Sequence, residues 1–144
     1  MKFHARGGLP AAVVLVVICA MPAHADPRGL WLAKDGAKVR VASCGKALCG
    51  KIEVPKSPAD PDTGRPWTDK DNPNPALRGR PLVGVEVFVS MMPDGPGKWT
   101  GTLYNTNGGQ SVPGHIYELD AHTLKIEGCV GAAMCGSQNM TRLK

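Results

Sequence analysis

The feature that most constrains the fold is an alternation of apolar and polar side chains that recurs in short runs. Residues 37–43, for example, alternate Val39 and Val41 with Lys38 and Arg40. Such a period of two is typical of antiparallel strands that bury one face and expose the other. The predicted strands cover residues 29–33, 37–43, 50–55, 82–91, 98–105, 112–120, 123–130 and 137–144. In the run 82–91, five apolar residues at alternate positions predict an unbroken apolar stripe: Val83, Val85, Val87, Val89 and Met91.

Turn signals separate these runs, among them Asp35-Gly36, residues 93–97 and Asn107-Gly108-Gly109. The 18 glycines and 13 prolines in 144 residues also oppose long helices. Strands in simple succession favour a closed, antiparallel up-and-down β-barrel, because closure removes the sheet edges. A two-sheet sandwich is the alternative. A barrel of about eight strands is either filled by side chains or holds one small ligand, and the sequence leaves that choice open.

Residues 56–81 interrupt the alternation with six prolines and no periodicity. Connections of this length are uncommon in compact domains and are usually functional or mobile. We expect a long loop here, and a loop beside a barrel opening could act as a lid.

The first 25 residues have the pattern of a secretory signal peptide. Lys2 and Arg6 precede an apolar run at residues 9–20, and Ala23-His24-Ala25 fits a cleavage site. The run is too short for a membrane-spanning helix, which needs about 20 apolar residues. The sequence therefore predicts cleavage after Ala25 and a single β-barrel domain at residues 26–144. No membrane anchor is expected to remain, and the protein should be periplasmic or secreted.

Four cysteines remain after this cut, and an even number in an oxidising compartment predicts two disulfides. Cys44 and Cys49 lie in phase with the polar faces of their strands and flank a hairpin loop, and Cys129 and Cys135 flank another. A crossed pairing would have to span about 10 Å between hairpins, whereas disulfides need Cα separations of about 4.4–6.8 Å. The predicted pairs are Cys44–Cys49 and Cys129–Cys135. The spacing does not match a structural zinc site, and no metal is expected.

Further landmarks run through most of the chain. They include Gly29 and Trp31, Leu48-Cys49-Gly50-Lys51-Ile52, Asp71-Asn72-Pro73-Asn74-Pro75, Arg80-Pro81-Leu82, Leu103-Tyr104-Asn105, Gly128-Cys129, Cys135-Gly136 and Thr141-Arg142. With these residues the chain resembles the small exported bacterial proteins of the domain of unknown function 2147 family. The resemblance covers essentially the whole mature region. It implies a lipocalin-like (calycin-type) barrel and a periplasmic or secreted location, and it implies no known activity.

The candidate ligand-binding residues are aromatic side chains that could line a pocket mouth, arginines that could clamp an anion, and polar residues of the long loop. They are Trp67, Asp71, Asn72, Arg78, Arg80, Trp99, Tyr104 and Arg142. A guanidinium group suits a carboxylate or phosphate because it can donate two parallel hydrogen bonds. The alternative is that Arg78 and Arg80 only tie the loop to nearby carbonyl groups and that the aromatic residues belong to the core.

Signals for other function classes are weak. No run of basic residues suggests nucleic-acid binding, and His115 and His122 are the mature chain's histidines, without a G-x-S-x-G nucleophile motif. No cofactor and no catalytic residue is expected, and a monomer is predicted. The sequence favours a non-enzymatic binder of a small apolar or anionic ligand, or of an envelope partner. The alternatives are a filled barrel acting as an envelope interaction or stress-protective module, and a hydrolase of envelope material that uses Asp71 and a histidine.

Overall fold

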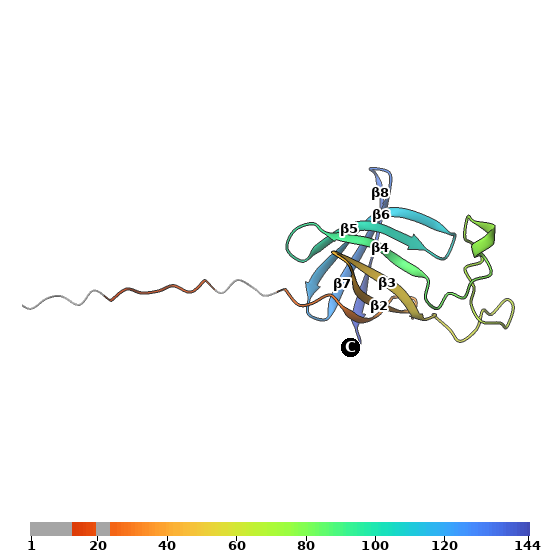
Figure 1. The fold of residues 1–144 in the computed structure, drawn as a ribbon, viewed down its shortest axis with the longest axis horizontal. Coiled ribbons are helices and arrows are strands. Elements are labelled where there is room, and N and C mark those ends of the chain that lie inside the picture. Colours follow the sequence, from red (N-terminus) through yellow and green to blue (C-terminus); the bar gives the residue numbers. More distant parts are fainter. Residues whose placement is uncertain (1–12, 20–23) are drawn as a thin grey trace, which may run out of the picture.

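The structure is a computed structural model that describes residues 13–19 and 24–144. Eight antiparallel strands form a closed barrel in which each strand pairs with its neighbours in sequence and the first pairs with the last (Figure 1). The strands are β1 (Gly29–Leu32), β2 (Lys38–Cys44), β3 (Ala47–Val54), β4 (Glu86–Pro93), β5 (Lys98–Asn105), β6 (Gln110–Asp120), β7 (Thr123–Val130) and β8 (Met134–Arg142). The predicted all-β, up-and-down barrel is confirmed.

The up-and-down order gives the barrel two different ends. The β2–β3, β4–β5 and β6–β7 turns lie at one end together with the start of β1 and the end of β8, and we call it the closed end. The four other connections, including the long one between β3 and β4, lie at the opposite end, which we call the open end.

Large apolar side chains fill the barrel toward the closed end. Trp31, Met91, Ile116, Leu124 and Met140 are all fully buried there or just above. The Trp31 indole donates a 2.9 Å hydrogen bond to the carbonyl of the nearby Pro27.

Arg142 covers Trp31 from the end of β8. Its guanidinium carbon lies 4.3 Å from the centroid of the Trp31 ring. The same guanidinium donates to the carbonyl groups of Ala121, Arg28 and Asp26 at 2.7, 2.8 and 2.5 Å. One cation therefore joins β8, the β6–β7 turn and the segment before β1, and so closes this end.

The prediction of a continuous apolar stripe at residues 83–91 is wrong. Val83 precedes β4 and is 57% exposed, whereas Phe88 and Met91 are buried inside the barrel. The reason is a bulge: Ser90 has a φ of 49°, and the β4–β5 register shifts between Val89 and Met92. A bulge adds one residue to one strand, so the inward-facing phase differs before and after it.

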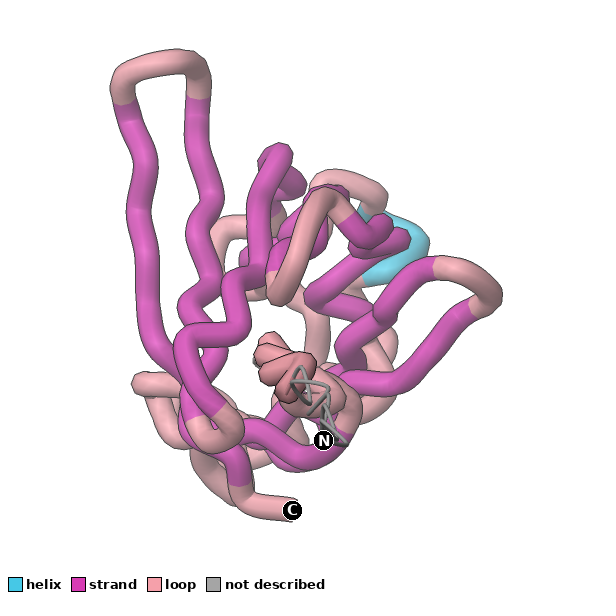
Figure 2. Tube along the Cα trace, turned by 90° about the vertical axis from the view of Figure 1, so that its left-hand side faces the viewer, coloured by secondary structure: helices cyan, strands magenta, loops and turns pink. Residues whose placement is uncertain are grey.

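The β7–β8 hairpin extends beyond its neighbours at the open end, where it stands tall in Figure 2. Its strands pair with each other up to Val130 and Met134, but pairing of β7 with β6 ends at Gly128. Val130 and Met134 are 62% and 72% exposed. The Cys129–Cys135 disulfide joins the two strands near this tip.

The second disulfide, Cys44–Cys49, lies at the β2–β3 turn of the closed end. The Cα atoms are 5.8 Å apart in this pair and 4.0 Å apart in Cys129–Cys135. Both pairings are those that the sequence predicts. Each bridge closes one hairpin, as expected from the shared polar phase of its two cysteines.

The segment between β3 and β4 contains one short 3-10 helix, η1 (Pro75–Leu77), and a bridge between Thr68 and Pro81. Its Trp67 packs with Ile52, Leu82 and Val85 in a second apolar cluster outside the main core. The expected long loop is therefore fastened to the barrel by a buried aromatic side chain.

Most of the predicted signal peptide, at residues 1–12 and 20–23, lies outside the described residues. Within the part that the structure describes, Val13 to Ile18 are exposed apolar residues. Over the same described part, no helix has the length and apolar character needed to cross a membrane.

Candidate functional site

A cavity of about 370 Å³ lies inside the barrel at its open end. Its wall is formed mainly by apolar side chains from seven strands, β2 to β8: Val39, Ile52, Val87, Phe88, Leu103, Val112, Ile126 and Met140. Polar side chains gather at the rim, where the β1–β2 and β5–β6 turns and the start of β8 meet: Asp35, Asn105, Thr106, Asn107, Ser137 and Gln138. The open end of the barrel is thus not filled by side chains.

Glycines determine where the wall can pack closely and where it stays open. A Cβ atom on Gly114 would lie 2.3 Å from Leu103 Cδ1, so only glycine lets that leucine lie against β6. Gly136 also lines the cavity, but a Cβ atom there would meet nothing within 4 Å. The rim beside β8 is therefore the place where the cavity has spare room.

A buried polar cluster lies directly behind the wall at Tyr104. Asp69 is fully buried, and its Oδ1 accepts a 2.6 Å hydrogen bond from the Tyr104 hydroxyl. Its Oδ2 accepts from the Asn72 amide at 2.8 Å and from Arg80 Nε and Nη2 at 2.9 and 2.7 Å. The Asn72 amide also donates to the Tyr104 hydroxyl at 3.1 Å. The cluster joins the long loop to β5, because Tyr104 itself lines the cavity.

These contacts fix the protonation of the cluster. Burial alone would raise the pKa of Asp69, but the hydrogen bonds from Tyr104, Asn72 and Arg80 outweigh it and hold this pKa below its usual value. Burial and the neighbouring Asp69 carboxylate raise the pKa of Tyr104. At neutral pH the cluster therefore contains a carboxylate and a neutral phenol that donates to it.

Further hydrogen bonds hold the loop together, and one attaches it to the outside of the rim. Arg78 Nε donates to the Asn72 carbonyl at 2.8 Å, and Asp71 Oδ2 accepts from the Gly108 amide at 3.3 Å. Buried Asp60 accepts a 2.9 Å hydrogen bond from Lys70. No residue of the segment 56–81 is among those lining the cavity. The loop thus supports the β5–β6 turn from the side, which differs from the lid expected from its length, because its buried residues bind it to the barrel wall.

The structure brings only part of the predicted ligand-binding set to the cavity. Tyr104 lines it, and Asn72 and Arg80 meet Tyr104 around Asp69. Trp67 lies in the second apolar cluster, and Trp99 is half-buried against the main core. Arg142 is at the closed end, so it does not meet the two loop arginines that were grouped with it.

Sequence reasoning did not place Asp69 among the site residues, although it is the centre of the polar cluster. Its partner Tyr104 is 35 residues away in the chain, and no local spacing connects the two. The only available signal was the density of acidic and amide side chains in this loop, which is equally typical of turns.

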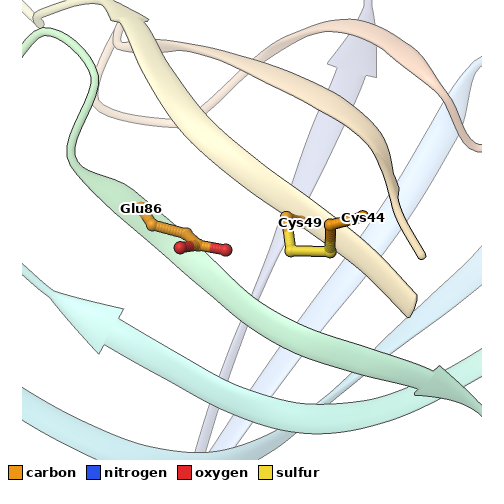
Figure 3. A group of neighbouring side chains, drawn as sticks. All are labelled: Cys44, Cys49 and Glu86. Atoms are coloured by element: carbon orange, nitrogen blue, oxygen red, sulfur yellow. A yellow bond between two sulfur atoms is a disulfide. The ribbon is translucent and has the colours of Figure 1, made fainter. Parts of the chain in front are cut away.

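Two other groups of side chains contain residue types that can bind metals or take part in catalysis. The Sγ atoms of Cys44 and Cys49 and a carboxylate oxygen of Glu86 lie within 4.8 Å of one another (Figure 3). Because the two sulfurs form a disulfide, they do not provide thiolate ligands.

The other group contains a histidine. The Thr100 hydroxyl donates to Asp94 at 2.8 Å and lies 2.8 Å from Nδ1 of His115. His115 alternates along β6 with the buried Gly114 and Ile116, so this arrangement is on the outside of the barrel, away from the cavity. Asp71, the acid of the hydrolase alternative, instead accepts a hydrogen bond from Gly108.

Comparisons with known proteins agree with this fold. A family model described as "Uncharacterized protein conserved in bacteria (DUF2147)" matches residues 29–142. Among solved structures, protein HP1028 from the human pathogen Helicobacter pylori, described as belonging to the lipocalin family, superposes with a TM-score of 0.71. The match covers 83% of this chain and 84% of that one at 19% sequence identity, so it establishes a lipocalin-like fold. A comparison with curated proteins finds no match to the chain.

Proposed function

The chain belongs to the DUF2147 family of uncharacterized bacterial proteins, and we propose that it binds one small, mainly apolar molecule inside the open end of its lipocalin-like barrel. The observation that carries this proposal is the cavity of about 370 Å³ with apolar walls. Pockets for small molecules commonly have volumes of about 300–1,000 Å³ and a mostly apolar lining with a few polar groups. This cavity is at the lower end of that range, which favours a compact ligand.

The lining also indicates the chemistry of the ligand. Removing apolar surface from water contributes roughly 25 cal/mol per Å², and most of this wall is apolar. Asp35 is the one charged side chain among the lining residues, and it is an acid. Arg78 and Arg80 use their guanidinium groups on loop partners. These features support a neutral apolar ligand over an anionic one, with rim amides such as Asn105 and Gln138 orienting a polar group.

We propose that this binding takes place after export. Cleavage after Ala25 would release the leader and leave the domain at residues 26–144, in the periplasm or outside the cell. The exposed apolar residues Val13 to Ile18 and the two disulfides support this location.

An interaction module remains the second candidate, and one observation favours it. The tip of the β7–β8 hairpin exposes Val130 and Met134, and a disulfide fixes its shape. A tip that docks on an envelope partner would need these side chains and would not need the cavity. The two functions can therefore be separated by variants in different places.

The test is native mass spectrometry of protein purified from its own envelope, with and without a blocked cavity. Gly136→Trp places an indole at the rim, where a Cβ atom meets nothing within 4 Å. Asn139→Trp adds the same side chain to an exposed, neighbouring position of β8 that does not line the cavity.

We expect a co-purified small-molecule mass on the wild type and on Asn139→Trp, and its loss from Gly136→Trp. Equal ligand occupancy in both variants, or the absence of bound mass from all three proteins, would contradict the proposal. Capture of a protein partner that is lost in Met134→Ser would instead support the interaction module.

A further inference from the structure

Glu118, near the end of β6, has a buried carboxylate with incomplete bonding. Its side chain is 4% exposed. One oxygen, Oε1, accepts a 2.6 Å hydrogen bond from the backbone amide of Ala25, and His24 Nδ1 is 3.9 Å from the same oxygen. The other oxygen, Oε2, has no hydrogen-bond partner among the residues that the structure describes. A buried carboxylate oxygen without a donor is costly, so it needs an explanation.

The residue that follows Ala25 is held in place at this site. Arg28 donates to the Asp26 carboxylate from Nε and Nη2, at 2.8 and 2.5 Å to Oδ2. The Asp26 carbonyl accepts a 2.5 Å hydrogen bond from Arg142, whose guanidinium covers Trp31. The backbone nitrogen of Asp26 is therefore fixed within one residue's length, less than about 3.8 Å, of the nitrogen that already contacts Glu118.

We propose that Glu118 is the binding site for the α-ammonium group that forms on Asp26 when the leader is removed after Ala25. Hydrolysis of the Ala25–Asp26 peptide bond consumes one water molecule and exchanges no electrons. The Ala25 carbonyl carbon becomes a carboxylate and leaves with the leader, and the Asp26 nitrogen becomes an ammonium group. The inference rests on cleavage at this bond and is independent of ligand binding at the other end of the barrel.

Cleavage changes what Glu118 can bind. It removes the Ala25 amide, which is a neutral donor with one N–H, and it creates an ammonium group with three N–H donors and a positive charge at the next backbone position. That group can satisfy both carboxylate oxygens and neutralise their charge. The buried, half-satisfied carboxylate is thus matched to the processed chain better than to the unprocessed one.

The other charged groups around the site are already engaged. Arg28 pairs with the Asp26 side chain, and Lys98, beside the Gly97 carbonyl that accepts from the Glu118 amide, pairs with Asp94 at 3.0 Å. Arg142 donates to three carbonyl groups. Within the described part of the chain, His24 is the one basic group within 4.0 Å of the carboxylate, and it leaves with the leader. The new terminus is then the cation that remains for Glu118.

The ion pair would complete the closed end only after export. The segment from Asp26 to Arg28 already binds Arg142, and Arg142 covers the buried Trp31. An ammonium group on Glu118 would join this segment to β6 as well. The start of the mature chain would then be bound to β8 through Arg142 and to β6 through Glu118.

The test measures the α-amino group of the mature protein. N-terminal sequencing first establishes that the exported chain begins at Asp26. Competitive acetylation of the terminus at pH 7 is then followed by mass spectrometry in the wild type, in Glu118→Gln and in Glu53→Gln. Glu53 is a control because it makes an exposed ion pair with Arg40 on another part of the barrel.

A carboxylate in contact raises the pKa of an amine by about one unit or more, so the wild-type terminus should react about tenfold more slowly than in Glu118→Gln. Glu53→Gln should react like the wild type. A mature chain that begins elsewhere, or equal acetylation rates in the wild type and in Glu118→Gln, would overturn the inference.

Discussion

The two ends of the barrel are held together by different kinds of interaction. At the closed end, fully buried apolar side chains such as Trp31 and Leu124 pack in the main core, and Arg142 covers them with hydrogen bonds to backbone carbonyls. At the open end, apolar walls surround a cavity, and the rim is supported from outside by charged and amide groups around Asp69. Rigidity therefore comes from packing at one end and from hydrogen bonds at the other.

This division has a physical reason. Filling the open end with large side chains would stabilise the barrel but would remove the space for a ligand. A polar cluster behind the wall fixes Tyr104 and the β5–β6 turn without occupying that space. Buried polar groups that are fully hydrogen-bonded can specify one arrangement of a surface loop, because any displacement leaves them unsatisfied.

The largest effect is expected from removing packing at the closed end. Trp31→Ala should lower the free energy of unfolding by about 3–5 kcal/mol, because it opens a large cavity in the core and removes the ring under Arg142. Trp67→Ala, in the smaller cluster under the long loop, should cost less and should mainly release the loop. Urea unfolding of both variants checks the order. Equal losses of unfolding free energy in the two variants would mean that apolar packing contributes no more to stability at the closed end than under the long loop.

The second prediction concerns the polar anchor at the open end. Asp69→Asn keeps the size of the side chain but removes the charge that Arg80 and Tyr104 bind, and should cost about 2 kcal/mol. The matched control is Asp71→Asn, which is exposed and makes one 3.3 Å contact, and which should change stability by less than about 0.5 kcal/mol. Hydrogen exchange should show faster opening at residues 105–110 in Asp69→Asn only. Unchanged exchange there would contradict a supporting role for the loop.

The same comparison explains which parts of the molecule the sequence could predict. Alternation at residues 123–130 reproduces β7 residue for residue, and the phase of the cysteines predicts both disulfides, because these properties depend on neighbours in the chain. The bulge at Ser90 was not predictable from a stripe of alternating valines, since the extra residue is determined by the partner strand. The Asp69 cluster was missed for a similar reason, because its donor Tyr104 lies on β5, and only the folded barrel brings that strand to the loop.

The third prediction is a pH dependence specific to the open end. The pKa of Asp69 is lower in the folded protein than its ordinary value of 3.8, so the unfolded state binds the proton more tightly. The stabilisation from this carboxylate is therefore complete above pH 3.8 and is lost as the pH falls through the lowered folded-state pKa. The difference in stability between the wild type and Asp69→Asn should be constant from pH 7 to 5 and should shrink below pH 4. If the stability difference between the wild type and Asp69→Asn stays constant down to pH 2, the lowered pKa of Asp69 is not the source of its stabilising effect.

The smallest effect on global stability is expected at the tip of the β7–β8 hairpin. Removing the disulfide at this tip should cost less stability than removing the disulfide at the β2–β3 turn. Cys44–Cys49 joins strands that also pair with β1 and β4, so replacing both cysteines with serine should cost about 2 kcal/mol.

Cys129–Cys135 lies beyond the last β6–β7 pair, in a two-stranded ribbon that has no third strand to support it. Two strands alone are marginally stable, so its loss should fray the tip locally and cost less than about 1 kcal/mol overall. Limited proteolysis should then cut the double serine variant between Val130 and Met134, while its unfolding midpoint stays near that of the wild type. A global loss as large as that from the Cys44–Cys49 variant would instead mean that the hairpin tip belongs to the cooperative core of the barrel, and the open end would then be less independent of the closed end than the structure indicates.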